Sequence, residues 1–345
     1  MKLAHFTTIL ITCLSYVPLH AQEKDYTQFV DPNIGTAHCR WFHYTPGAAP
    51  FGMAKPAPST NGSSGNLQGW EATGYDYRHN SIEGFANFHE FQLGGIMFAA
   101  STGKLQTVPG ALEDPDSGYR SRFDHADETA TAGYYSVLLK DYKIRAELTA
   151  TPRVAFHRYS FPATKEAHIL FDIGNQLGES GPVKDAEVQL LPDGRIEGWV
   201  TTLPVYIQKY QPGAEVTMYF SAKLDKVPTG FGTFTGSDIH PGEKRITGKG
   251  AGLYLDFATK EGEAISIRAG LSLTSVANAR LNLQQEAETL SFDEARTLSR
   301  RSWNSMLGRI DVQGGTKENT VKFYTGLYHA LLGRGLASDV NGDYP

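Results

Sequence analysis

The sequence predicts a mainly β fold: an antiparallel β-sandwich, followed by a helical linker and by the first helix of an α-helical domain. Three observations predict it. Apolar residues alternate with polar ones in many short runs up to about residue 275, which is the period of a β-strand. A helix-capping pattern then begins at Ser291, and a strongly apolar stretch with helical periodicity covers residues 321–332.

The strand pattern is clearest in three runs. Ile144, Ala146 and Leu148 alternate with charged or polar residues, and residues 216–222 and 265–273 repeat this alternation. Turn signals such as PDG separate the runs, and each run predicts a sheet with one face in water. We therefore expect a sandwich over residues 22–280.

A helical linker is predicted over residues 281–314. In SFDEARTLSRRSWNSML, Ser291 and Glu294 form a capping box, in which each side chain satisfies a free backbone amide. The apolar side of this helix comprises Phe292, Ala295, Trp303, Met306 and Leu307.

Residues 315–345 are predicted to begin an α-domain. On a helix over 321–332, apolar side chains cover an arc of about 200°: Val321, Phe323, Tyr324, Leu327, Tyr328, Ala330, Leu331 and Leu332. So apolar a helix belongs between packed layers. We expect its partners to lie beyond Pro345 and interpret the chain as the front part of a longer protein.

The composition excludes some functions. A hydrophobic content of 40% is normal for a globular protein, and a net charge of -5 offers no basic face for nucleic acid. Aromatic residues at 11% and 36 glycines suit turn-rich β structure with rings that pack in a core or bind sugars.

The first 21 residues are predicted to be a secretory signal. Lys2 precedes a short apolar stretch, and Ala21 is a small residue before a cleavage point. No later segment reaches about 18 apolar residues, so no membrane span is expected. The protein is expected to be secreted or periplasmic, and a lipoprotein if Cys13 is acylated. If Cys13 is removed, Cys39 has no partner for an intrachain disulfide.

Several motifs resemble glycoside hydrolase family 92, the bacterial exo-acting α-mannosidases. They are VDPNIGT, PGAAPFGM, GYDY with SIEGF, and LYHALL with SDVNG, and the resemblance covers essentially the whole mature chain. It implies a β-sandwich joined by a helical linker to an (α/α)6 barrel, with the active site between them. The chain would hold the first helix of that barrel, truncated.

The resemblance implies calcium-dependent hydrolysis of α-mannosides in glycans with inversion. An acid protonates the glycosidic oxygen and a base activates water, so the two carboxyl groups stand roughly 6.5 to 9.5 Å apart. Family members hold calcium, the acid and the base in the barrel. The catalytic residues are therefore expected beyond Pro345, the chain alone is expected to be inactive, and no metal ligand is assigned within it.

Two residues are the main sugar-binding candidates. Trp70 in LQGWEATGYDY matches the tryptophan that reaches the mannose pocket in the family, and its alternative is a core tryptophan. Asp339 in SDVNG is a carboxylate that could accept hydrogen bonds from sugar hydroxyls. Its alternative is a residue that shapes the turn before Asn341 and Gly342.

Two histidines are further candidates by resemblance. His43 precedes PGAA as a histidine does in the family, and His89 in NFHEF matches another family histidine; the alternative for each is a structural histidine. HEFQL lacks the second histidine of a zinc protease motif. The chain departs from the family at AHCRWFHYTPGA, where bulky residues replace glycine and histidine, so the mannosidic linkage stays open.

Two other functions stay open. The chain could be a catalytically inert carbohydrate-binding or structural sandwich, with aromatic residues exposed at 41–44, or part of a hydrolase of another sugar family. The downstream reading frame would discriminate: a barrel with paired carboxylates supports the mannosidase, and an immediate stop supports the binding module.

Overall fold

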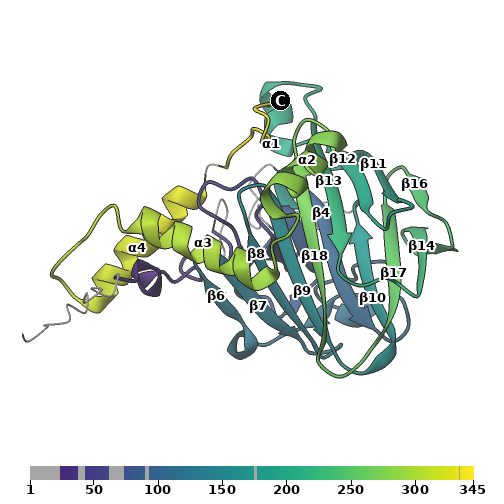
Figure 1. Ribbon diagram of the computed structural model, residues 1–345, viewed down its shortest axis with the longest axis horizontal. Helices are drawn as coiled ribbons and strands as arrows, with labels where there is room; N and C mark the ends of the chain where they lie inside the picture. Colours follow the sequence, from purple (N-terminus) through teal and green to yellow (C-terminus); the bar gives the residue numbers. More distant parts are fainter. Residues whose placement is uncertain (1–23, 38–42, 62–73, 90–92, 175–176, 334) are drawn as a thin grey trace, which may run out of the picture.

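The structure, a computed structural model, describes residues 24–37, 43–61, 74–89, 93–174, 177–333 and 335–345. Two large antiparallel sheets lie face to face, and helices follow them in the sequence (Figure 1). The predicted order of a β-sandwich and then helices is therefore confirmed.

The described residues form one sheet of seven strands and one of nine. The seven-stranded sheet has the order β1 (Ala57–Ser59), β3 (Gly84–His89), β4 (Gly94–Thr102), β10 (Thr164–Asp172), β17 (Ala251–Thr259), β14 (Gly230–Thr235), β15 (Asp238–Pro241). The nine-stranded sheet has the order β16 (Arg245–Thr247), β11 (Val183–Leu190), β12 (Ile196–Thr202), β13 (Val216–Leu224), β18 (Glu263–Ser272), β9 (Val154–Phe161), β8 (Ile144–Ala150), β7 (Tyr134–Leu139), β6 (Thr129–Thr131). A small separate pair consists of β2 (Ser81–Ile82) and β5 (Ser121–Arg122).

The main core lies between the two large sheets. Alternate residues of each strand point inward, so rings from both sheets meet there. Phe98 of β4 and Phe171 of β10 are 4.5 Å apart between ring centroids, and Phe171 stacks on Phe220 of β13 at 6.3 Å. The three predicted period-two runs are confirmed as β8, β13 and β18, with their apolar residues buried in this core.

The prediction that each sheet has one face in water is wrong for part of the nine-stranded sheet. Part of its outer face is covered by α2 (Val276–Ala287) and α3 (Phe292–Leu307), where Val154 and Phe156 pack against Leu283 and Phe292. Gly270 of β18 allows this close approach, because a Cβ atom there would lie 2.1 Å from the carbonyl oxygen of Ala279.

Two helices were not predicted. Helix α1 (Val205–Tyr210) is a short insertion between β12 and β13. Helix α2 begins at Ser275, whose side chain accepts a hydrogen bond from the backbone N–H of Asn278. This serine and the spacing of Ala279, Leu283 and Ala287 were the signals for α2, but much of the rest of the helix is polar. Short 3₁₀ helices are η1 (Tyr26–Phe29), η2 (Pro115–Ser117), η3 (His125–Asp127) and η4 (Gly178–Ser180).

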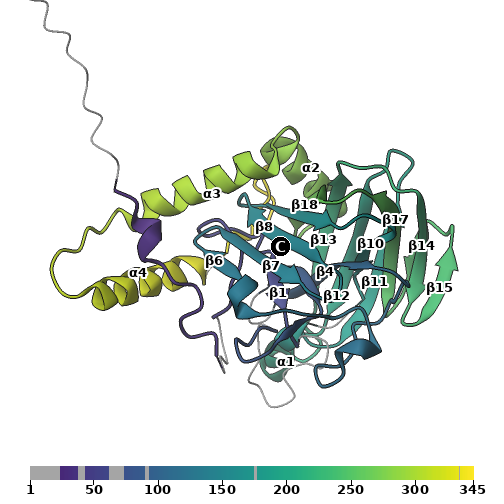
Figure 2. The same cartoon turned by 90° about the horizontal axis from the view of Figure 1, so that it is seen from below.

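The two predicted helices are confirmed. The capping box at the start of α3 is complete. The Ser291 side chain accepts a hydrogen bond from the backbone N–H of Glu294, and the Glu294 side chain accepts one from the backbone N–H of Ser291. The apolar stretch lies in α4 (Lys317–Leu332), which begins four residues before the predicted start, with Thr316 as its cap. Helices α3 and α4 extend away from the sandwich with η1 between them, as both views show (Figure 2).

The expectation that α4 lacks partners within the chain is wrong for one of its faces. Tyr324, Tyr328 and Leu332 are almost fully buried, in a cluster with Trp303 of α3 and with Tyr75. Rings of η1 complete the cover, since Phe29 stacks on Tyr324 at 5.5 Å. Phe323 and Ala330, on another face of α4, are exposed.

Candidate functional site

The PGAAPFGM motif forms a loop that contacts both the sandwich and the end of α4. A Cβ atom at Gly47 would lie 2.4 Å from the carbonyl oxygen of Leu148, so the glycine lets the loop pass close to β8. Further along, the backbone N–H of Phe51 donates to the carbonyl oxygen of Leu331 at 3.1 Å, and the Phe51 oxygen accepts from Leu336 at 2.8 Å. The loop is therefore hydrogen-bonded both to the last turn of α4 and to the segment that follows this helix.

The two candidate histidines lie close to this loop, His43 just before it in the sequence and His89 beside Met53 in space. His43 stacks on His329 of α4, with 4.2 Å between ring centroids. Burial, and then the charge of His43, lower the pKa of His329 to about 4. His89, at the end of β3, is buried and stacks on Tyr44 at 4.8 Å.

His89 also lines a cavity of about 60 Å³ at the end of the sandwich, with apolar walls from Met53, Leu273 and Leu336. Small-molecule pockets begin at about 300 Å³. The cavity is therefore too small for a mannose ring, and neither an aspartate nor a glutamate lines it. The role of both histidines in sugar binding stays a prediction.

Asp339 is buried and bound by protein donors. Its Oδ2 accepts hydrogen bonds from the hydroxyls of Ser272 at 2.9 Å and Thr274 at 2.5 Å, and its Oδ1 accepts from Nδ2 of Asn282 at 2.6 Å. Next to it, the carbonyl oxygen of Ser338 accepts from Nε of Arg153 at 2.7 Å. These contacts are those of a residue that anchors a loop, which was the alternative interpretation; sugar binding by Asp339 stays a prediction.

Trp70 lies outside the described residues, and so do Arg40, Trp41 and Phe42 of the altered pocket wall. The expectation of exposed aromatic residues at 41–44 is wrong for Tyr44, which is 2% exposed. Its ring is covered because it packs between His89 and the α4 cluster.

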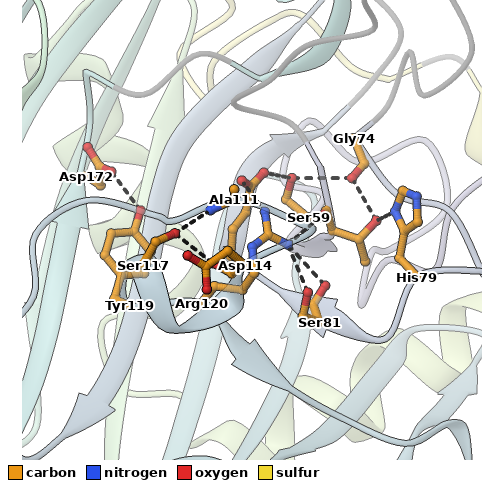
Figure 3. A network of polar contacts seen from close by, with 12 residues as sticks. Ser59, Gly74, His79, Ser81, Ala111, Asp114, Ser117, Tyr119, Arg120 and Asp172 are labelled. Carbon is orange, nitrogen blue, oxygen red and sulfur yellow. Dashed lines mark hydrogen bonds and ion pairs between the residues drawn. The ribbon is translucent and has the colours of Figure 1, made fainter.

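The residues that flank 62–73 are held together by a buried polar network (Figure 3). The carbonyl oxygen of Gly74 accepts from the backbone N–H groups of Thr60 at 2.7 Å and Asn61 at 3.0 Å. The Arg120 guanidinium donates to the Thr60 carbonyl at 2.5 Å and forms an ion pair with Glu83 at 3.2 Å. Both side chains of this pair are at most 1% exposed, so removing either partner would leave a buried charge unpaired and would be costly.

Sequence reasoning missed this network. Glu83 belongs to the SIEGF motif, but Arg120 lies in a segment without periodicity, and only the fold brings the two together. Tyr119, the residue before Arg120, donates a hydrogen bond to Asp172 at 2.7 Å, and burial raises the pKa of Asp172 to about 7.

The GYDY motif is fixed by a second buried carboxylate, Glu128. One of its oxygens accepts from the hydroxyls of Tyr75 at 2.9 Å and Tyr135 at 2.7 Å, and the other is 2.6 Å from Nδ1 of His125. Tyr77 stacks on His125 at 3.8 Å. The motif therefore has a structural explanation: its tyrosines dock on the segment that leads into β6.

Within the described ranges, no group of three or more His, Cys, Asp or Glu side chains is placed to hold a metal ion. The described residues therefore contain no calcium site built from three such side chains. Among the same residues, no helix combines the length and apolar character needed to span a bilayer.

Comparisons with known proteins agree with the motifs. The family model described as the glycosyl hydrolase family 92 N-terminal domain matches residues 29–272, and the one described as the family 92 catalytic domain matches residues 278–345. Comparison with curated proteins gives no match.

Solved structures with the same fold include members of this family. A family GH92 α-mannosidase of Bacteroides thetaiotaomicron, solved with mannoimidazole, is 28% identical over 93% of this chain and 42% of its own, with a TM-score of 0.83. A GH92 family glycosyl hydrolase is 28% identical over 93% and 42% of the chains, with a TM-score of 0.77. An inverting GH92 mannosidase of Bacteroides thetaiotaomicron is 22% identical over 93% and 41%, with a TM-score of 0.77, and shows the fold alone.

This chain thus spans less than half the length of the solved relatives. Its sandwich matches the family's N-terminal domain and its last helices match the start of the catalytic domain, so the chain belongs to glycosyl hydrolase family 92.

Proposed function

We propose that this chain is part of an exo-acting α-mannosidase that removes terminal mannose from glycans with inversion and with calcium as cofactor. The observation that carries the proposal is the 28% identity, over 93% of the chain, to an α-mannosidase solved with mannoimidazole. The sandwich supplies one wall of the sugar site through Trp70, whose ring can stack on sugar C–H bonds.

The catalytic acid and base are proposed to be outside residues 1–345. Two observations support this. The cavity at the end of the sandwich has no acidic side chain in its walls, and the nearby carboxylate of Asp339 is engaged by three protein donors. An inverting pair also needs two free carboxyl groups that stand roughly 6.5 to 9.5 Å apart, with room for a water molecule between them and the substrate.

Mannose release tests this proposal. Residues 22–345 and the protein encoded by the complete reading frame are each incubated with an aryl α-mannoside and with mannobioses of each linkage, with calcium or with a chelator. We expect turnover only by the longer protein and only with calcium, and NMR of the first product should show the β-anomer. Calcium-dependent turnover by residues 22–345 would refute the location of the carboxylates.

Trp70→Ala in the longer protein tests the wall. Loss of one stacked ring is expected to lower kcat/KM by roughly tenfold to a hundredfold, or about 1 to 3 kcal/mol, with an unchanged melting temperature. A core tryptophan would instead cost about 3 to 5 kcal/mol of stability. A large drop in melting temperature with normal kinetics would assign Trp70 to the core.

The protein is proposed to be exported, on the basis of residues 1–21. The mass of the mature protein tests this. A chain that begins at Gln22 supports signal cleavage, an acylated chain that begins at Cys13 supports a surface lipoprotein, and an intact Met1 contradicts export.

A second candidate, an inert carbohydrate-binding module, is favoured by one observation. Tyr206 and Tyr210 of α1 are exposed, at 40% and 74%, and their ring centroids are 5.0 Å apart. Paired exposed rings are a common sugar-binding surface. Calorimetric binding of mannobiose to residues 22–345 that is lost in Tyr210→Ala, without any turnover by the longer protein, would support this candidate over the enzyme.

A further inference from the structure

Helix α4 ends without the usual local cap. The last carbonyl groups of a helix have no partner within it, and a glycine in the left-handed conformation commonly supplies one. Gly333 follows α4, but its φ of -72° and ψ of -4° are right-handed. Its backbone N–H satisfies only the carbonyl oxygen of His329, so the carbonyls after His329 need other donors.

The PGAAPFGM loop and the residue two positions after it supply donors for the last two of these carbonyls. The backbone N–H of Phe51 reaches the Leu331 oxygen at 3.1 Å, and Nζ of Lys55 reaches the Leu332 oxygen at 2.7 Å. Phe51 has a φ of +55°, which is unfavourable for a residue other than glycine, and its two backbone hydrogen bonds stabilise it there.

The burial and the chemistry of Lys55 suit it to cap the end of α4. Its side chain is buried, at 1% exposure of the residue, which is rare for lysine unless it is paired. Burial lowers the pKa of Lys55 to about 7, and the amine donates a hydrogen bond to Leu332 in either protonation state. When it is protonated, its charge also complements the negative end of the α4 dipole.

The contact joins segments that belong to different parts of the family. Lys55 lies in the segment matched by the N-terminal domain model, and Leu332 lies in the segment matched by the catalytic domain model. The turn that Lys55 holds also carries His329, which stacks on His43, and leads to Leu336 in the cavity wall.

We infer that Lys55 is a positioning residue that caps α4 from the sandwich and thereby places His329 against His43. This role concerns the junction itself and does not depend on which sugar, if any, the protein cleaves.

The test uses the 345-residue chain and compares Lys55→Met, which keeps length and removes the donor, with Lys55→Gln, which keeps a shorter donor. Lys140→Met is the control, because Lys140 is a half-exposed lysine paired with Asp124. His329→Gln identifies the His329 imidazole signal by NMR. The two readouts are the titration of that imidazole and the hydrogen exchange of the Phe51 and Gly333 amides.

In the wild type, we expect His329 to titrate at about 4. In Lys55→Met, the titration should move up by at least one pH unit toward the ordinary histidine value of about 6.5, because the ring leaves its buried position. Exchange of both amides should rise by at least tenfold, while the amides of β10 keep wild-type exchange. Lys140→Met should match the wild type in every readout.

A folded Lys55→Met with an unchanged His329 titration and unchanged exchange would overturn the inference. If Lys55→Met does not fold, Lys55→Gln decides. Because the glutamine donor is shorter than the lysine amine, the inference requires faster exchange of the Phe51 and Gly333 amides while β10 stays protected. Equal loosening of all three would instead show that Lys55 has no specific role at α4.

Discussion

Nδ2 of Asn282, on α2, lies 2.6 Å from Oδ1 of Asp339, in the segment after α4. Asn282 also contacts the next residue, because its Oδ1 accepts from the backbone N–H of Val340 at 2.9 Å. Asn282 thus holds both the side chain and the backbone of this segment against α2. The SDVNG motif is therefore docked on α2 through a buried carboxylate.

Asp339→Ala is expected to lower the free energy of unfolding by about 2 to 4 kcal/mol, because it removes the acceptor of three buried or half-buried hydrogen bonds and leaves one N–H of Asn282 unsatisfied. Urea denaturation of the 345-residue chain measures this. Asp343→Ala, at an exposed position of the same turn, is the control and should change stability by less than about 1 kcal/mol. Unchanged stability in Asp339→Ala, together with lost mannoside binding by the longer protein, would restore the sugar-binding interpretation.

We predict that the free energy of unfolding falls in acid because of His157. It is buried between the sheets, where its Nε2 is 2.8 Å from Oδ1 of Asn87, and burial lowers its pKa to about 3. The unfolded chain, with a histidine pKa of about 6.5, binds more protons between these values. Stability should therefore fall with decreasing pH from about 6.5 to 3, by up to about 1.4 kcal/mol per pH unit from this group.

The control for this prediction is His157→Gln, which can keep a hydrogen bond to Asn87 but does not titrate. The difference in unfolding free energy between wild type and variant should depend on pH in that window and be constant above it. A difference that is constant down to pH 4 would show that His157 protonates without unfolding the core.

Two glycine-to-alanine changes should have opposite effects. Gly270→Ala should be destabilising, since its Cβ would lie 2.1 Å from the Ala279 oxygen and would push α2 off the sheet. Gly326 lies in the middle of α4, and a Cβ atom there would meet no atom within 4 Å. Gly326→Ala should therefore stabilise the protein by about 0.5 to 1 kcal/mol, because alanine has the higher helix propensity. Thermal melting of both variants measures the pair, and a stabilised Gly270→Ala would contradict the tight contact of α2 with β18.

Trp303 is predicted to be the main link between α3 and the PGAAPFGM loop. It is fully buried, its Nε1 donates to the carbonyl oxygen of Ala48 at 2.7 Å, and its ring lies 4.6 Å from that of Tyr328. Trp303→Ala should cost about 3 to 5 kcal/mol in urea denaturation. Trp303→Phe, which keeps an aromatic ring and loses the donor, should cost less, and equal costs would show that the Ala48 hydrogen bond dominates.

The amino-acid pattern predicted those elements whose formation depends on neighbours close in sequence. The period-two runs that became β8, β13 and β18 record which side of a strand is buried, and the capping box at Ser291 is a contact between residues three apart. The family motifs predicted the domain order. The same patterns did not predict α2, because burial of Ala279 and Leu283 depends on Gly270, which lies outside the helix.

The candidate site was predicted only as a set of residue types. That His43 meets His329, and that Asp339 is occupied by Ser272, Thr274 and Asn282, required the fold, because these contacts join residues far apart in the chain. The buried pair of Glu83 and Arg120 left no trace in periodicity for the same reason.

By itself, then, the sequence determined the sandwich, helices α3 and α4 and the family, because local periodicity, capping and short motifs are encoded within a few residues. Only the tertiary structure decided what each polar side chain does. Whether a carboxylate such as Asp339 can receive a ligand depends on which donors already surround it, and those donors come from strands and helices that only folding brings together.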